Sequence, residues 1–143
     1  MSIKGNKIEK TNTDLRKFLP LVLTRFGTSI FNPELIYQSL LKETKISKNN
    51  AHKIMEQVIR FLISANLKII TAPLIREVVN VHLLKNGLER ERLQYTRIGL
   101  PYFDLKDIFT NTENPKNCED VVSKILNWVI EEYYAVDKLI EER

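Results

Sequence analysis

The chain of 143 residues is poor in the residue types that build disulfides and metal sites, and it has no long apolar run. Its single cysteine, Cys118, excludes an internal disulfide and any zinc site made of several cysteines. Neither His52 nor His82 has a cysteine or a second histidine at metal-ligand spacing. No apolar segment approaches the roughly 20 residues that span a bilayer, and the basic N-terminus lacks the apolar core of a signal peptide. These absences predict a cytoplasmic protein with no membrane partner.

Catalytic motifs are missing as well. The sequence has no phosphate-binding loop that ends in Gly-Lys-Ser/Thr, no recognisable carboxylate pair and no metal-ligand cluster. We therefore expect that the chain is not an enzyme and that it acts by binding.

The charge of the chain is uneven. Residues 117–143 hold three basic and seven acidic side chains, whereas residues 1–112 carry a net charge of +8 within a total of +4. A basic body suits a partner that bears phosphate, from a nucleotide to a nucleic acid. It also suits a surface that serves only solubility, and charge alone does not decide between them.

The order of apolar, capping and breaking residues predicts an α+β fold that is mostly helical. Strands are expected over Leu19–Thr24 and Ser29–Phe31, with Gly27 in the turn of a hairpin. Six helices are expected. Three of them begin at the capping residues Asn32, Ser47 and Thr71, two cover 88–98 and 104–109, and the last runs from Asn117 almost to the end of the chain. The expected architecture is a bundle of about four helices covered by a small β-hairpin, plus a long C-terminal helix.

The same pattern divides the chain into three parts. Residues 1–18 form a polar, lysine-rich arm that we expect to be flexible, and residues 19–110 form the folded domain. Residues 111–143 form a polar linker containing Asn114 and Pro115, followed by the amphipathic helix. The apolar stripe of this helix is longer than a small domain covers, so we expect it to mediate homo-oligomer formation or to bind a partner protein.

Two segments carry a resemblance to a known family. The sequence IITAPLIREVVNVHLLKNGLERERLQYTRIGLPYFD (70–104) resembles the regulatory ATP-cone at the N-terminus of archaeal anaerobic (class III) ribonucleotide reductases. Upstream, VLTRFG (22–27) followed by FNPELI (31–36) is similar to the nucleotide loop of that family. The resemblance implies an allosteric domain that binds ATP or dATP, with magnesium, without hydrolysing it. The glycine radical loop, catalytic cysteines and zinc site of those reductases have no counterpart in this sequence.

The resemblance also implies a set of nucleotide contacts. ATP-cones carry the loop pattern Val-x-Lys-Arg-(Asp/Asn)-Gly, because a polyphosphate needs cationic donors and glycine lets the backbone approach it closely. Basic residues on neighbouring helices are candidates for further phosphate contacts. The candidate nucleotide-binding residues are Val22, Thr24, Arg25, Phe26, Gly27, Lys53, Arg76 and Arg97.

The loop departs from the family pattern where phosphate is held. Thr24 replaces the loop lysine, Phe26 replaces the acidic or amide residue, and Leu35 replaces a helix lysine. Ala72 stands where the family usually has serine or threonine. Each lost cation costs about 1.5–3 kcal/mol if it made a charged hydrogen bond. Two such losses weaken binding by roughly several hundredfold, since about 1.4 kcal/mol is tenfold.

Two functional hypotheses follow. The chain is a free-standing ATP-cone-like regulator that binds adenine nucleotide and controls a partner such as ribonucleotide reductase. Alternatively, it is a cone-derived scaffold that needs no cofactor and binds RNA, a ribosomal surface or DNA through its basic body and arm. The candidate nucleic-acid contacts are Lys4, Lys7, Lys10, Arg16 and Lys17.

Overall fold

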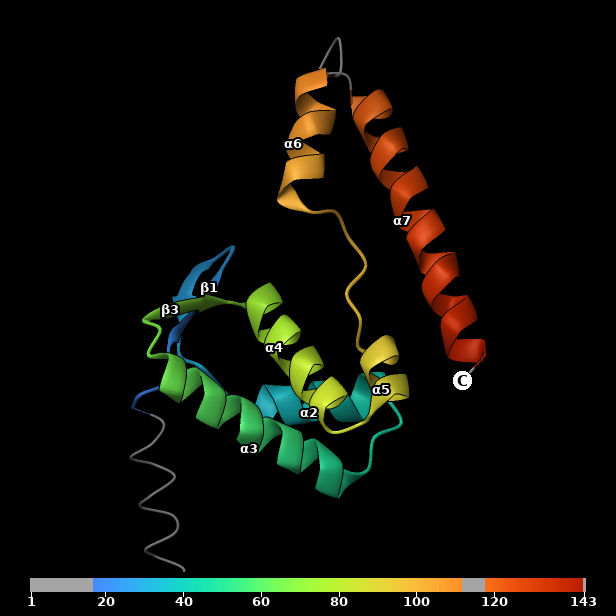
Figure 1. Cartoon of the computed structure of the whole chain (residues 1–143). Coiled ribbons are helices and arrows are strands. Elements are labelled where there is room, and N and C mark those ends of the chain that lie inside the picture. The colour runs from blue at the N-terminus through green and yellow to red at the C-terminus, as the bar shows by residue number, and fades with distance from the viewer. Residues whose placement is uncertain (1–16, 112–117, 143) are drawn as a thin grey trace, which may run out of the picture. The chain divides into compact units, whose positions relative to one another are not determined.

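The computed structural model describes residues 17–111 and 118–142. Its contacts divide the chain into two compact units, and the division falls between Tyr95 and Thr96 (Figure 1). The contacts therefore group residues 96–110 with the C-terminal helix, whereas the sequence pattern places them with the folded domain.

The first unit contains a three-stranded mixed sheet. Its strands are β1 (Leu21–Thr24), β2 (Gly27–Ser29) and β3 (Ile69–Thr71), and their order in the sheet is β2-β1-β3. β1 and β2 form the predicted antiparallel hairpin, in which Val22 lies opposite Ser29. β2 begins and ends two residues earlier than the strand predicted over Ser29–Phe31, so Gly27 is its first residue. Gly27 has a φ of 112°, a region that favours glycine. β3 was not predicted: it runs parallel to β1 and places Ile70 beside Val22.

Four helices of the first unit follow the predicted order. They are α2 (Glu34–Glu43), α3 (Lys48–Ala65), α4 (Ala72–Lys85) and α5 (Glu89–Gln94). The side-chain oxygens of the three predicted capping residues accept backbone N–H groups of the first turns at 3.2, 3.2 and 3.3 Å, namely Asn32, Ser47 and Thr71. These contacts satisfy N–H groups that have no partner within the helix. α5 ends at Gln94, so the helix predicted over 88–98 is shorter than expected.

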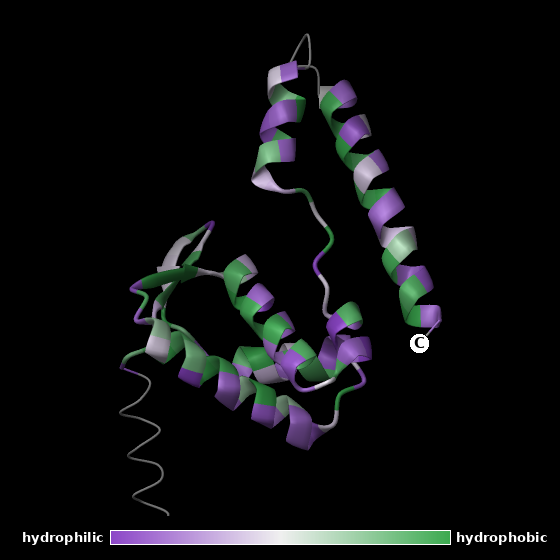
Figure 2. Cartoon of the chain, in the orientation of Figure 1, coloured by the Kyte–Doolittle hydropathy of each residue, from purple (hydrophilic) through white to green (hydrophobic). Residues whose placement is uncertain are grey.

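The core of the first unit lies between these helices and the inner face of the sheet. The predicted apolar face of α3 is buried, and Figure 2 shows hydrophilic residues along the outer side of this helix. Each fully buried aliphatic side chain contributes roughly 1.5–3 kcal/mol to folding. The buried cluster comprises Phe31, Ile36, Leu40, Ile46, Ala51, Ile54, Val58, Leu62, Ile70, Val79, Leu83 and Tyr95.

The second unit is a pair of helices, α6 (Tyr102–Asn111) and α7 (Cys118–Glu141). They pack against each other and bury Val121, which is 6% exposed. The predicted long C-terminal helix is confirmed, and Figure 2 shows hydrophobic residues along much of its length. Of the predicted linker, residues 112–117 lie outside the described residues.

The predicted fold class is confirmed: the described residues form a mostly helical α+β structure with six helices, a small mixed sheet and a long C-terminal helix. None of these described helices is both long enough and apolar enough to cross a membrane.

Candidate functional site

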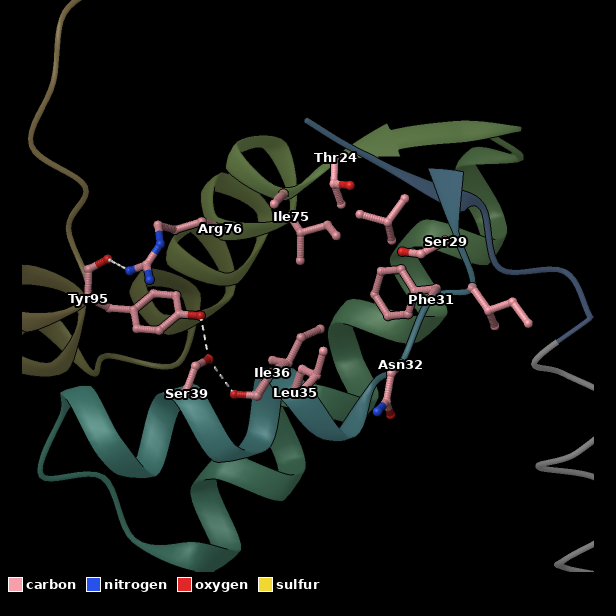
Figure 3. A pocket seen from close by; sticks show the side chains of 13 residues that line it. Thr24, Ser29, Phe31, Asn32, Leu35, Ile36, Ser39, Ile75, Arg76 and Tyr95 are labelled. Atoms are coloured by element: carbon pink, nitrogen blue, oxygen red, sulfur yellow. Dashed lines mark hydrogen bonds between the residues drawn. The ribbon is translucent and has the colours of Figure 1, made fainter. Parts of the chain in front are cut away.

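A pocket of about 330 Å³ opens in the first unit, under the hairpin and between α2 and α4 (Figure 3). Leu35 and Ile36 face it from α2, Ile75 faces it from α4, and Phe31 closes it near the end of the hairpin. The complete lining is Val22, Thr24, Ser29, Ile30, Phe31, Asn32, Leu35, Ile36, Ser39, Ala72, Ile75, Arg76 and Tyr95. The walls are thus mainly aliphatic and aromatic, with a few hydroxyl groups and one charged residue.

Tyr95 forms one end of the pocket and is only 4% exposed. Its hydroxyl lies 2.7 Å from Ser39 Oγ, and the Ser39 hydroxyl donates to the backbone oxygen of Ile36 at 2.9 Å. Since serine has a single hydroxyl proton, the Tyr95 hydroxyl must donate to Ser39. Burial raises the pKa of Tyr95, and the positive charge of Arg76 offsets this rise only in part. Tyr95 is therefore a neutral donor at physiological pH.

Arg76 holds Tyr95 in place. Its Nη1 donates to the backbone oxygen of Tyr95 at 2.7 Å, and its guanidinium carbon lies 4.1 Å from the centre of the Tyr95 ring. Asn80 Nδ2 makes a longer contact of 3.5 Å to the same oxygen. A cation over an aromatic face adds about 0.5–2 kcal/mol to such a contact. Arg76 and Asn80 thus hold Tyr95, the last residue of the first unit.

The charge of Arg76 is already neutralised. Its Nη2 lies 3.0 Å from Glu43 Oε1 and its Nη1 lies 3.0 Å from Glu43 Oε2, which is a bidentate pair. Burial lowers the pKa of Arg76, but the hydrogen bond and charge of Glu43, together with Tyr95, raise it by more. Arg76 is thus a permanent cation that is committed to Glu43 and Tyr95.

The structure separates the predicted loop residues. Val22 and Thr24 line the pocket, whereas Arg25, Phe26 and Gly27 lie at the exposed hairpin tip, outside the lining. The guanidinium carbon of Arg25 lies 4.8 Å from the centre of the Phe26 ring, and Phe26 is 86% exposed. At this tip the aromatic ring meets solvent and a cation, and it does not cover the pocket.

The Thr24 side chain makes hydrogen bonds within the hairpin turn. Its hydroxyl donates to the backbone oxygen of Gly27 at 3.0 Å and accepts from the backbone N–H of Phe26 at 3.2 Å. Both contacts close the hairpin turn, as threonine hydroxyls often do. Thr24, at the position where the predicted resemblance has a lysine, therefore stabilises the turn.

The remaining candidates lie apart from the pocket lining. Lys53 is exposed on α3, and Arg97 is exposed in the second unit. Lys17 is exposed at the start of the described residues. Four of the candidate nucleic-acid contacts, Lys4, Lys7, Lys10 and Arg16, lie outside the described residues.

Sequence reasoning missed Ser39 and Tyr95 as pocket residues. They are 56 positions apart, and nothing local in the sequence signals that they meet. It did single out Leu35 and Ala72 as departures from the family pattern, and both line the pocket. Of the four altered positions, Thr24, Leu35 and Ala72 line the pocket, whereas Phe26 lies outside it.

Comparison of the chain with protein-family models, with curated proteins and with solved structures gave no match. The resemblance to the ATP-cone therefore stays a prediction.

Proposed function

We propose that this chain is an ATP-cone-like regulatory module that binds an adenine-containing small molecule and controls a partner, such as a ribonucleotide reductase. One observation carries the proposal. Val22, Thr24, Leu35 and Ala72, which the resemblance aligns with the nucleotide site of the family, all line one pocket. They come from a strand and two helices, and the pocket is where the resemblance implies that the ligand lies.

The size and the walls of the pocket support a flat, mostly apolar ligand group. Small-molecule sites usually measure roughly 300–1,000 Å³ and combine apolar walls with a few polar groups. The volume of about 330 Å³ is at the lower end of that range. Phe31, Ile36 and Ile75 supply apolar area for a purine ring, and the Tyr95–Ser39 pair supplies polar atoms at one end.

The residues present do not fit a triphosphate with magnesium. Arg76 is the one charged residue in the lining, and Glu43 neutralises it. Arg25 is exposed at the hairpin tip, where ion pairs contribute roughly 0–1 kcal/mol. Within residues 17–111 and 118–142, no group of three or more His, Cys, Asp or Glu is placed to hold a metal ion. A triphosphate that entered the pocket would therefore find no free counter-charge in the lining.

Calorimetric titration of the purified chain with ATP, dATP and adenosine tests this proposal. We expect binding of at least one of them, abolished by Ala72→Phe because the added ring fills the pocket. Val81→Phe is the matched control, since Val81 is exposed on the same helix outside the lining. Heat changes that stay flat for all three compounds up to millimolar concentration contradict the proposal.

For the partner, α7 offers an apolar and acidic surface. Val122, Leu126 and Tyr133 are spaced by four and seven positions and are half exposed or more. Its bounds enclose six acidic and two basic side chains, a net charge of −4. Two copies of α7 repel each other at low salt, so we propose a partner protein with a basic apolar groove or helix.

A designed helix with leucine and lysine at heptad spacing is a suitable probe for this surface. We expect the chain to bind it, with an affinity that falls as salt rises and is lost in Leu126→Glu. Light scattering on the chain alone tests the competing possibility, a second copy of the chain. A concentration-dependent dimer that Leu126→Glu disrupts would identify a second copy as the occupant of this surface.

The alternative function, nucleic-acid binding, is favoured by the charge of the first unit. Residues 17–95 hold twelve basic and six acidic side chains, a net charge of +6. Contacts to phosphate give an affinity that falls steeply with salt. Fluorescence anisotropy with a labelled single-stranded RNA across a salt series measures this, and strong salt-dependent binding without any response to adenine compounds selects the alternative.

A further inference from the structure

We propose that the pocket selects a neutral adenine nucleoside over its triphosphate; this inference rests on the proposed function. Two features of the pocket carry it: the commitment of its one charged side chain, and the orientation of the hydroxyl groups at the Tyr95 end.

The first feature is the bidentate pair between Arg76 and Glu43. Both Nη atoms of Arg76 lie 3.0 Å from Glu43 oxygens, and Nη1 also donates to the Tyr95 backbone oxygen. A phosphate that entered the lining would have to displace Glu43 or remain without a counter-charge. Displacing Glu43 would also release Tyr95, because Arg76 lies across its ring. Burying an anion without a partner is strongly unfavourable, so the lining disfavours phosphate.

The second feature is the direction of the hydrogen bonds at Tyr95. The Tyr95 hydroxyl donates to Ser39, and Ser39 donates to the backbone oxygen of Ile36. Both hydroxyl protons are therefore in use, so Tyr95 Oη, which belongs to a residue that lines the pocket, can only accept a further hydrogen bond. An acceptor at this point favours a ligand that carries an N–H donor. The exocyclic amine of adenine supplies one, whereas inosine has a carbonyl oxygen at the same ring position.

The two features together define an order of affinity. Adenosine combines a neutral ribose with an amine donor, so it meets both conditions. ATP meets the second condition only, and inosine meets the first only. We expect adenosine to bind at least about tenfold more tightly than either compound, since an unmet polar contact of about 1.4 kcal/mol corresponds to tenfold.

The experiment is a titration of the full chain with adenosine, inosine and ATP under one salt condition, followed by the same series on two variants. Leu35→Lys places a cation at a half-exposed lining position. We expect this variant to raise the ATP-to-adenosine affinity ratio about tenfold or more. Leu84→Lys adds the same charge on α4 outside the lining, and we expect it to leave the ratio unchanged.

A third variant tests the hydroxyl orientation. Ser39→Ala removes the acceptor of the Tyr95 proton, so the Tyr95 hydroxyl becomes free to donate to a ligand. We expect the preference for adenosine over inosine to shrink or reverse in this variant, provided that circular dichroism shows an intact fold.

The outcomes separate the inference from the proposed function. ATP binding as tight as adenosine binding in the unmodified chain overturns the inference and leaves the proposed function standing. An affinity ratio that responds equally to Leu35→Lys and Leu84→Lys also overturns it. Absence of binding by all three compounds rejects both the inference and the proposed function.

Discussion

The two units of this chain differ in how they bury apolar residues. In the first unit, side chains from four helices and a strand close around one core, and Leu40, Ile54 and Leu62 are fully buried. In the second unit, only Val121 among the described residues falls below a tenth exposed. Tyr102 and Phe103 of α6 and Tyr134 of α7 are mostly exposed.

This difference in burial predicts that the first unit is more stable by its own packing than the second unit. Burial contributes roughly 25 cal/mol per Å² of apolar surface removed from water, so the first unit holds most of the hydrophobic stabilisation. A helix pair with so little buried surface opens more readily and gains most from a partner. Large exposed apolar surfaces commonly mark sites of protein association. The comparison therefore predicts that the first unit supplies most of the stability, and it agrees with the proposal that the second unit binds a partner.

The largest expected effect is on the free energy of unfolding, and a leucine-to-alanine substitution in each unit tests the difference between them. Leu62→Ala removes a fully buried side chain from α3, and we expect it to lower the free energy of unfolding by roughly 2–5 kcal/mol. Leu126→Ala changes a side chain of α7 that is 50% exposed, and we expect about 1 kcal/mol or less. Both sites are helical, so helix propensity changes equally. Urea unfolding followed by circular dichroism measures both values, and equal losses would remove the distinction between the units.

The next effect concerns the contact that ends the first unit. Arg76→Met keeps much of the side-chain volume but removes the donors to Glu43 and to the Tyr95 backbone oxygen. We expect a loss of about 1.5–3 kcal/mol in the free energy of unfolding, the range for charged hydrogen bonds. Arg60→Met is the control, because Arg60 is exposed on α3. A loss in Arg76→Met no larger than in the control means that this contact does not stabilise the unit.

The buried Tyr95 hydroxyl makes the free energy of unfolding depend on pH in the alkaline range. Its pKa is raised in the folded state, so the folded chain holds the phenol proton more tightly than the unfolded chain does. The resulting stabilisation is fully present below the unfolded pKa, about 10, and is lost as pH rises through the folded value. Tyr95→Phe should lose about 1 kcal/mol at neutral pH, from the missing hydrogen bond, and should show a shallower alkaline decline. Tyr134→Phe, at an exposed site in the second unit, should retain the full decline.

Local signals in the sequence were sufficient for most of the helices of both units. The caps at Ser47 and Thr71 lie where the helices begin, because a short polar side chain satisfies free N–H groups wherever the chain continues as a helix. The buried face of α3 follows from its spacing of apolar residues, since that spacing matches the turn of a helix.

Long-range contacts were beyond such signals. β3 has only three residues, too few for an alternating pattern, and it pairs in parallel with a strand that ends 45 positions earlier. Arg76 was a candidate phosphate contact because it is basic and lies in the segment that resembles the ATP-cone. Its actual partner, Glu43, is 33 positions away, and no local rule predicts that pairing. The charge of the pocket is therefore a property of the fold and not of the loop alone.

The last comparison takes one glycine from each unit and includes the smallest expected effect, that of Gly99→Ala. Gly87 has a φ of 71° and ends α4: its N–H donates to Leu84, and the N–H of Leu88 donates to Leu83. This is a Schellman motif, in which glycine avoids the left-handed strain of other residues. Gly87→Ala should therefore cost about 1–2 kcal/mol.

Gly99 of the second unit has no such constraint. Its φ is outside the left-handed region, and a Cβ added there meets no atom within 4 Å. Gly99→Ala should stabilise the chain by about 0.4–1 kcal/mol, because alanine reduces the freedom of the unfolded chain. Thermal unfolding of the two variants measures effects of opposite sign. Destabilisation by Gly99→Ala would show that position 99 needs a backbone conformation that alanine does not adopt without strain, and it would contradict this prediction.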